Sequence, residues 1–173
     1  MQAETRQTRI ADSILMEMDQ EAETTKRLFN VIPDDKLSWR PHPKARSLGE
    51  LAMHVARIPG SVAEIARLDT KEAGTFPVDP EATSRAQILE VFEESLQKGK
   101  EIVASTDDTQ AMAEWSLTKD GTPLMTMPRA GFWRMVLLNH NYHHRGQLSA
   151  YLRELDVVMP SIYGPSADTN PFA

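Results

Sequence analysis

Apolar residues recur at steps of three and four along four separate stretches of the chain, the period of amphipathic α-helices. These stretches cover approximately residues 10–29, 47–68, 84–103 and 129–155. Ser47 and Glu50 form a capping-box pattern at the start of the second stretch, and Ser84 and Gln87 do so at the third. Pro59, in the middle of the second stretch, predicts a kink or break there.

The connections between these helices are long. The link over residues 36–46 contains two prolines, and residues 69–83 form a loop with Gly74, Pro77 and Pro80. Residues 106–128 are compatible with either a small hairpin or an irregular loop. The tail over residues 156–173 lacks a helical period but is apolar enough to pack against the bundle or a partner subunit. The pattern predicts one domain over residues 1–173, an all-α four-helix bundle with long connections.

Composition narrows the functional classes. The chain has 173 residues, which suits one domain, and its formal net charge of -6 argues against a general nucleic-acid surface. No apolar run approaches the roughly 20 residues that span a bilayer. Met1–Arg9 is polar and lacks the apolar centre of a signal peptide, so we expect a cytoplasmic protein. The chain has no cysteine, which excludes disulfides, thiolate metal sites and cysteine nucleophiles.

Histidines on the predicted apolar helix faces are the main candidates for chemistry. His140 and His144 are four residues apart, so they share one face of the fourth helix, and His54 lies at the edge of the apolar face of the second. The stripe that contains the pair also includes Trp133, Leu137, Leu148, Tyr151 and Leu155. Buried imidazoles require partners, and a divalent metal would serve all three. The structural alternative is a set of hydrogen-bonded core histidines. His143 and His42 are interpreted as rim or surface residues, although His143 could also replace a neighbouring histidine as a ligand.

Neighbouring residues suggest supporting roles, each with a structural alternative. Glu50, one turn before His54, could accept a hydrogen bond from that imidazole, but the capping box is the favoured explanation of this residue. Asn141 and Gln147 could line a pocket. Arg145 could bind a substrate carboxylate or could be a solvated charge on the helix surface.

The arrangement of these motifs resembles the DinB-like (YfiT-like) superfamily. The resemblance covers nearly the whole chain, and rests on His54 in Leu51-Ala52-Met53-His54-Val55, on residues 139–148 with Tyr151-Leu152-Arg153, and on the closing segment 158–168. It implies a four-helix bundle, often homodimeric, with a divalent metal on His54, His140 and His144. It also implies activities that depend on thiols such as bacillithiol or mycothiol. Related chains often have an acidic residue where this one has Thr169.

Three hypotheses for function follow. Three neutral imidazoles leave a divalent metal with open positions, the arrangement of catalytic sites. The leading hypothesis is metal-assisted transfer of a low-molecular-weight thiol to an electrophile, because a chain without cysteine must take its thiol from a cosubstrate. The second is a metal-dependent hydrolase, and the third a non-catalytic metal-binding or dimerisation module that responds to stress. Zinc, nickel, iron and copper all suit imidazole ligands.

Overall fold

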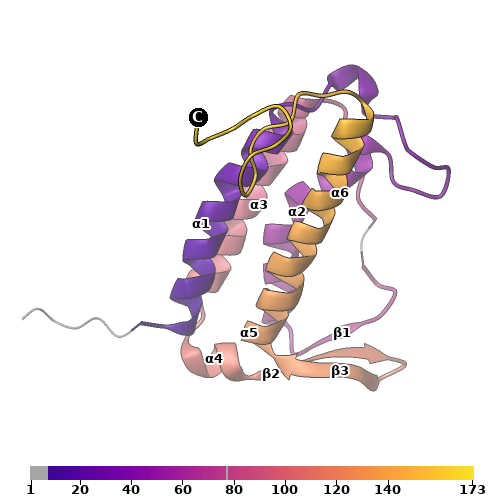
Figure 1. Ribbon diagram of the computed structural model, residues 1–173. Coiled ribbons are helices and arrows are strands. Elements are labelled where there is room, and N and C mark those ends of the chain that lie inside the picture. Colours follow the sequence, from indigo (N-terminus) through magenta and orange to yellow (C-terminus); the bar gives the residue numbers. More distant parts are fainter. Residues whose placement is uncertain (1–7, 77) are drawn as a thin grey trace, which may run out of the picture.

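The computed structural model describes residues 8–76 and 78–173; the predicted polar lead-in up to residue 7 and the loop residue Pro77 lie outside this part. Long helices run close to the predicted stretches (Figure 1). They are α1 (Ile10–Phe29), α2 (Leu48–Arg67), α3 (Arg85–Ser105) and α6 (His140–Glu154). Shorter helical segments accompany them, namely η1 (Asp34–Lys36), α4 (Asp108–Met112), α5 (Arg129–Phe132) and η2 (Trp133–Asn139).

A three-stranded mixed sheet at one end of the helices shows that the predicted all-α four-helix bundle is wrong as a fold class (Figure 1). Its strands are β1 (Thr70–Glu72), β2 (Glu114–Lys119) and β3 (Thr122–Pro128), in the order β1-β2-β3. β1 pairs with β2 in parallel, and β2 with β3 in antiparallel fashion. The parallel pairing joins segments far apart in the sequence, so no local period could indicate it.

Residues 106–128, for which the sequence allowed a hairpin or an irregular loop, contain the hairpin of β2 and β3. Its two-residue turn is Asp120-Gly121, with φ values of 50° and 75°. Positive φ at both central residues is the requirement of a type I′ turn, and aspartate and glycine tolerate it. Trp115 of β2 then attaches the hairpin to the helices, because its ring stacks on Phe132 at 4.0 Å between centroids and its Nε1–H donates to the Ile65 carbonyl over 3.2 Å.

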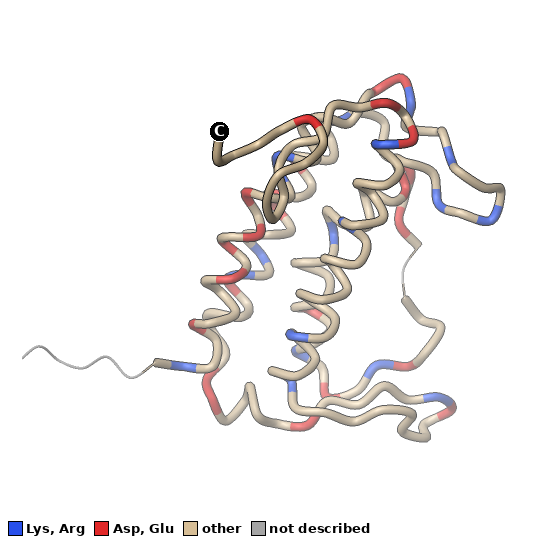
Figure 2. Tube along the Cα trace, in the orientation of Figure 1, with Lys and Arg blue, Asp and Glu red and all other residues tan. Residues whose placement is uncertain are grey.

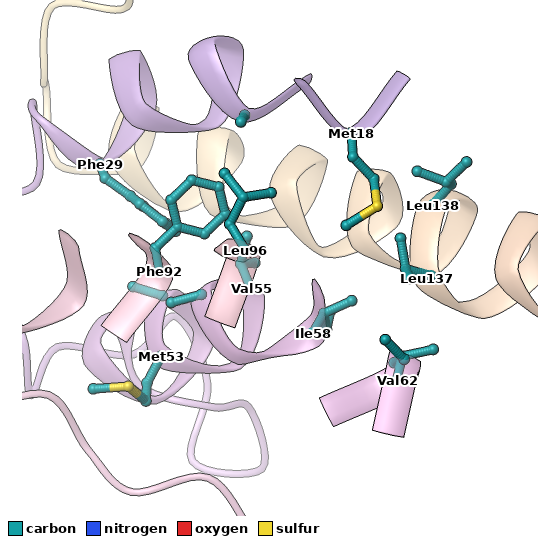
Figure 3. Close-up of a cluster of buried hydrophobic side chains, with 14 of the residues drawn as sticks. Met18, Phe29, Met53, Val55, Ile58, Val62, Phe92, Leu96, Leu137 and Leu138 are labelled. Carbon is teal, nitrogen blue, oxygen red and sulfur yellow. The ribbon is translucent and has the colours of Figure 1, made fainter. Parts of the chain in front are cut away.

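The core lies among the four long helices. Figure 3 shows side chains of α1, α2, α3 and the segment before α6 meeting there, among them Met18, Ile58, Phe92 and Leu137. The predicted caps form at Ser47, where both capping-box bonds with Glu50 are present, and at Ser84, whose hydroxyl accepts from Gln87. Capping therefore set these two helix starts as the sequence indicated.

Pro59 does not break α2, which continues through it to Arg67. Neighbouring side chains replace the hydrogen bonds that the proline disturbs. The Gly60 N–H donates to Ser95 Oγ of α3 over 2.8 Å, and that hydroxyl donates to the Arg57 carbonyl over 3.0 Å. Opposite, Gly99 of α3 lies so close that a Cβ atom there would be 2.6 Å from the Pro59 oxygen. The backbones of α2 and α3 thus meet at this point because glycine lets them.

The predicted fourth helix is divided by a π-helical segment, η2 (Trp133–Asn139), in which the His140 N–H bonds to the Met135 carbonyl. The buried positions nevertheless continue at steps of three and four from Trp133 and Leu137 into α6. The fully buried line of α6 consists of Asn141, Arg145, Leu148 and Leu152. Trp133, Leu137 and Leu148 of the predicted stripe are buried as expected. His140 and His144 lie one position before the buried Asn141 and Arg145 and are half-buried.

We expect Gly99→Ala to lower the free energy of unfolding by about 1–3 kcal/mol, because the new methyl group must push α2 and α3 apart. The matched control is Gly146→Ala in α6, where a Cβ meets nothing within 4 Å and removal of a helical glycine should stabilise by about 0.5–1 kcal/mol. Urea unfolding measures both. Equal effects of the two changes would contradict the close approach at Pro59.

Candidate metal centre

Three of the predicted site residues converge. One ring nitrogen each of His54, His140 and His144 lies within 4.8 Å of the others. The Nε2 atoms of His140 and His144 are 2.8 Å apart, and the His54 ring centroid is 4.4 Å from that of His144. All three side chains are half-buried. α2 and α6 therefore present their histidines at the same height, which the sequence could not indicate.

A hydrogen bond next to these histidines sets the relative height of α2 and α6. Pro59 has no N–H, so the Val55 carbonyl, four residues earlier, lacks its usual helical donor. The buried side chain of Asn141 donates to that oxygen over 3.2 Å. Val55 follows His54 and Asn141 follows His140 in the sequence, so this bond aligns the two helices at the site. Asn141, expected to line a pocket, instead has this structural role.

His54 is oriented by a carboxylate that no sequence pattern indicated. Its Nδ1 lies 2.6 Å from Asp79 Oδ2, in the loop before α3. Burial raises the pKa of Asp79, but the hydrogen bond and charge of His54, with Arg57 and Arg46, lower it by more. Asp79 is therefore an ionised acceptor and His54 Nδ1 the donor. In the neutral ring the lone pair is then on Nε2, an atom that is buried without a hydrogen-bond partner among the described residues.

The other two imidazoles favour their neutral forms. Burial lowers the pKa of His144 to about 4, although its hydrogen bond with Gln147 opposes this. Burial, with the nearby charge of His54, also lowers the pKa of His140. His144 Nδ1 lies 2.7 Å from Gln147 Oε1, which can only accept, so the lone pair of the neutral His144 ring is on Nε2. Metal ligation requires neutral imidazoles with free lone pairs.

These observations fit a divalent metal ion. Two Nε2 atoms are held as lone-pair donors by hydrogen bonds at the opposite ring nitrogen, as is usual for metal-ligating histidines. Metal binding would also satisfy the buried, unpartnered Nε2 of His54. The three histidines could therefore hold a divalent metal.

A cavity of about 370 Å³ adjoins the histidines and is lined by His54 and His140. Its wall is mainly apolar and includes the hairpin residues Trp115, Leu117 and Met125. Small-molecule sites commonly have this size and lining. The hairpin, absent from the predicted fold, thus forms part of the surroundings of the site.

The remaining candidates fall outside the histidine cluster or serve other roles. Glu50 accepts from the Ser47 N–H over 2.7 Å, so the capping interpretation is the one observed. Gln147 accepts a hydrogen bond from His144. His143 and His42 are exposed, as expected.

Both interpretations offered for Arg145 were wrong. Its side chain is only 2% exposed and forms an ion pair of 2.7 Å with Glu21 of α1. Its guanidinium group lies 5.0 Å from the ring centroid of Tyr142 and 5.1 Å from that of Tyr163. Figure 2 shows acidic residues spaced along α1, and Glu21 is among them. Arg145 therefore neutralises a carboxylate of α1 and holds Tyr163 of the tail.

The tail, residues 156–173, packs against its own chain. The Tyr163 hydroxyl donates to Glu21 over 2.7 Å, and Arg27 donates to the Ser161 carbonyl over 3.2 Å. Met159 is buried. Thr169 donates through its hydroxyl to the Met159 carbonyl over 3.0 Å. This bond stabilises the turn of the tail.

Asp79 could not be identified from sequence because it lies 25 residues after His54 in a loop with no period. A spacing argument applies along one helix, whereas the loop returns to α2 only in the folded chain. Glu50 was a candidate because it lies on the same helix as His54, where helical geometry applies.

A helical domain with a small mixed sheet and a three-histidine cluster defines the class of protein. The sequence model of the DinB family matches residues 1–170, and the chain belongs to that family. It is 25% identical over 157 residues to YrdA, described as an uncharacterized protein of Bacillus subtilis (strain 168), with 91% of this chain and 90% of YrdA covered. The family resemblance drawn from the motifs is thereby confirmed.

Solved structures share the fold. A DinB-like protein from Bacillus cereus ATCC 10987 has a TM-score of 0.69 and 24% identity, covering 88% of this chain and 97% of its own. DinB-like YjoA from Bacillus subtilis has a TM-score of 0.64 and 17% identity, covering 91% and 98%. None of the helices in residues 8–76 and 78–173 has the length and apolar character needed to cross a membrane.

We expect Asn141→Ala to lower the free energy of unfolding by about 1–3 kcal/mol, because the buried Val55 carbonyl loses its donor. Asn139→Ala, at an exposed position just before α6, is the matched control and should change stability little. Chemical unfolding of both variants checks this. A neutral Asn141→Ala would contradict the role assigned to the bond.

The metal-free protein should lose stability between pH 6.5 and about 4 through His144. Its pKa is about 4 when folded and near 6.5 when unfolded, so the unfolded chain binds the proton first as pH falls. The contribution is complete above pH 6.5 and is lost as pH falls toward 4. Unfolding of chelator-treated protein across this range should show a shallower pH dependence in His144→Gln than in wild type; identical slopes would contradict the shift.

Proposed function

We propose that the protein is a divalent-metal-dependent enzyme that transfers a low-molecular-weight thiol to an electrophile, with the metal on His54, His140 and His144. The observation that carries the proposal is the unpartnered, buried Nε2 of His54, close to the His140 and His144 rings and beside a cavity. A bound divalent cation would lower the pKa of a thiol and make it nucleophilic at neutral pH.

The chain's own residues would supply orientation and space. Asp79 and Gln147 hold the tautomers of His54 and His144. The adjoining cavity has room for an electrophile, and its largely apolar wall would limit water. The sulfur forms a bond to carbon, and the thiol proton is taken up by the adduct or leaves with the departing group. Because the chain has no cysteine, the thiol must come from a second substrate.

The hydrolase alternative would need a general base to activate water. Among the described residues that line the cavity, the one carboxylate is Asp79. It accepts from His54 and pairs with Arg57 at 3.3 Å, so it is already engaged. This engagement favours thiol transfer over hydrolysis.

The non-catalytic alternative draws on exposed apolar residues of the tail. Val158 and Tyr163 are 69% and 70% exposed and could contribute to a homodimer. A homodimer is compatible with catalysis, so oligomeric state by itself would not separate the two functions.

Elemental analysis of protein purified without a nickel column tests the metal site. We expect about one divalent metal per chain, lost in His54→Ala, His140→Ala and His144→Ala. His143→Ala is the matched control, because His143 is exposed and adjacent to His144, and it should retain the metal. Wild-type protein that stays metal-free after reconstitution, or equal loss in His143→Ala, would contradict the site.

The same proteins should then be assayed with small thiols and a panel of electrophiles. Turnover is expected to require both metal and thiol, and to disappear in His140→Ala but not in His143→Ala. Undiminished turnover in chelator-treated protein would sink the metal-dependent proposal. Turnover with metal but without thiol would favour the hydrolase.

We expect Asp79→Asn to weaken metal affinity about 10–100-fold, because the amide cannot orient and polarise His54 as the carboxylate does. Glu50→Gln is the control: an amide still serves the capping box, and Glu50 accepts from Ser47 rather than from His54. Competition with a chelator of known affinity measures both. Equal weakening by the two variants would contradict the role of Asp79.

A further inference from the structure

The cavity beside the metal centre combines two chemical features. Most of its wall is apolar, contributed by α2, by the segment before α6 and by the hairpin, and includes Val62, Ile65, Val136, Leu117 and Met125. Its charged lining residues are Arg46, Arg57 and Asp79. His54 and His140 belong both to this lining and to the histidine cluster, so a molecule in the cavity reaches the metal ligands directly.

The charges on the lining do not balance. Asp79 faces both guanidinium groups, at 3.3 Å from Arg57 and 3.9 Å from Arg46. One carboxylate against two arginines leaves one positive charge in excess with a neutral His54, and a protonated His54 would add to that excess. Both arginine side chains are partly exposed, at 34% and 44%, and can turn toward a ligand. An anionic group near them would be attracted, and a cationic group repelled.

The size of the cavity restricts the ligand further. A volume of about 370 Å³ suits a small organic molecule and excludes a folded partner or a polymer chain. Phe76, 48% exposed, stands in the lining on the loop that carries Asp79. An apolar body would displace water from the hairpin side while the anionic group stays near the arginines.

We infer that this cavity is the electrophile subsite and that the electrophile is a small organic anion with an apolar body, an aryl or alkyl carboxylate in chemical class. The inference rests on the proposed function, since it assigns the second substrate of the same centre. Arg46 and Arg57 select the charge, and the hairpin wall selects the apolar body.

The test compares three probes with one apolar body: 4-phenylbutyrate, 4-phenylbutan-1-ol and 4-phenylbutylammonium. Each is titrated into chelator-treated full-length protein, so that direct ligation of a metal by the carboxylate cannot contribute. The Trp115 indole resonance, from the cavity wall, reports binding, and the Trp39 indole serves as a reference, because Trp39 packs on Tyr151 instead. We expect the carboxylate to bind about tenfold more tightly than the alcohol, and the ammonium most weakly.

Two variants separate the contributions. Val136→Phe should fill the cavity and weaken all three probes at least tenfold, whereas Met135→Phe, at the adjacent exposed position, should leave them unchanged. The double variant Arg46→Gln/Arg57→Gln leaves Asp79 as the sole charge on the described lining and should reverse the order, so that the ammonium binds best. Arg40→Gln/Arg67→Gln makes the same change in net charge at exposed positions away from this lining and should keep the original order.

Each outcome bears on the inference separately from the proposed function. No movement of the Trp115 resonance, or equal affinity for the three probes, would overturn the substrate class even in a protein that binds metal. Selective carboxylate binding that Val136→Phe abolishes would support the subsite. If such a protein then failed to bind metal, the proposed function would fall while the anion-selective cavity remained.

Discussion

The hydrogen bond from Asn141 to the Val55 carbonyl is the constraint on which the three-histidine cluster depends. Pro59 leaves that carbonyl without a helical donor, and a buried oxygen without a partner costs about 1–3 kcal/mol. The Asn141 side chain satisfies it from α6. Because each partner is adjacent in sequence to a candidate ligand, one bond both repairs the proline defect and aligns His54 with His140 and His144. A residue that weakens α2 by itself therefore helps to position the site.

The close contact of α2 with α3 supports this arrangement from the other side. Ser95 accepts the Gly60 N–H, and Gly99 allows the Pro59 carbonyl to approach. α2 is thus held between α3 and α6 over residues 55–60, directly after His54. Rigid elements hold site geometry better than loops do. Asp79 orients His54 from a loop, and its ion pairs with Arg57 and Arg46 fix the position of its carboxylate.

Positive and negative charges serve different purposes on the two sides of α6. Toward α1, Arg145 and Arg134 pair with Glu21 and Glu17, and Tyr163 of the tail joins the first of these pairs. Those arginines are committed to structure. Toward α2, Arg46 and Arg57 share a single carboxylate and remain partly exposed, so they have capacity to attract a ligand. A sequence motif cannot separate these roles, because the arginines differ in their carboxylate partners and not in residue type: Arg134 and Arg145 each have a glutamate, whereas Arg46 and Arg57 share Asp79.

The sequence by itself determined the long helices, the helix starts at Ser47 and Ser84, the family and the three histidines, because periodicity, capping and the motif around residues 139–148 are local features. Only the tertiary structure decided the mixed sheet, since β1 pairs with a strand more than 40 residues later. It also decided that Asp79 rather than Glu50 contacts His54, and that Arg145 and Asn141 are buried. It further decided that a π-helical segment precedes His140, and that the two histidines of α6 lie beside its buried line. Contacts between distant segments leave no period in the sequence, and the charge and shape of the cavity arise from such contacts.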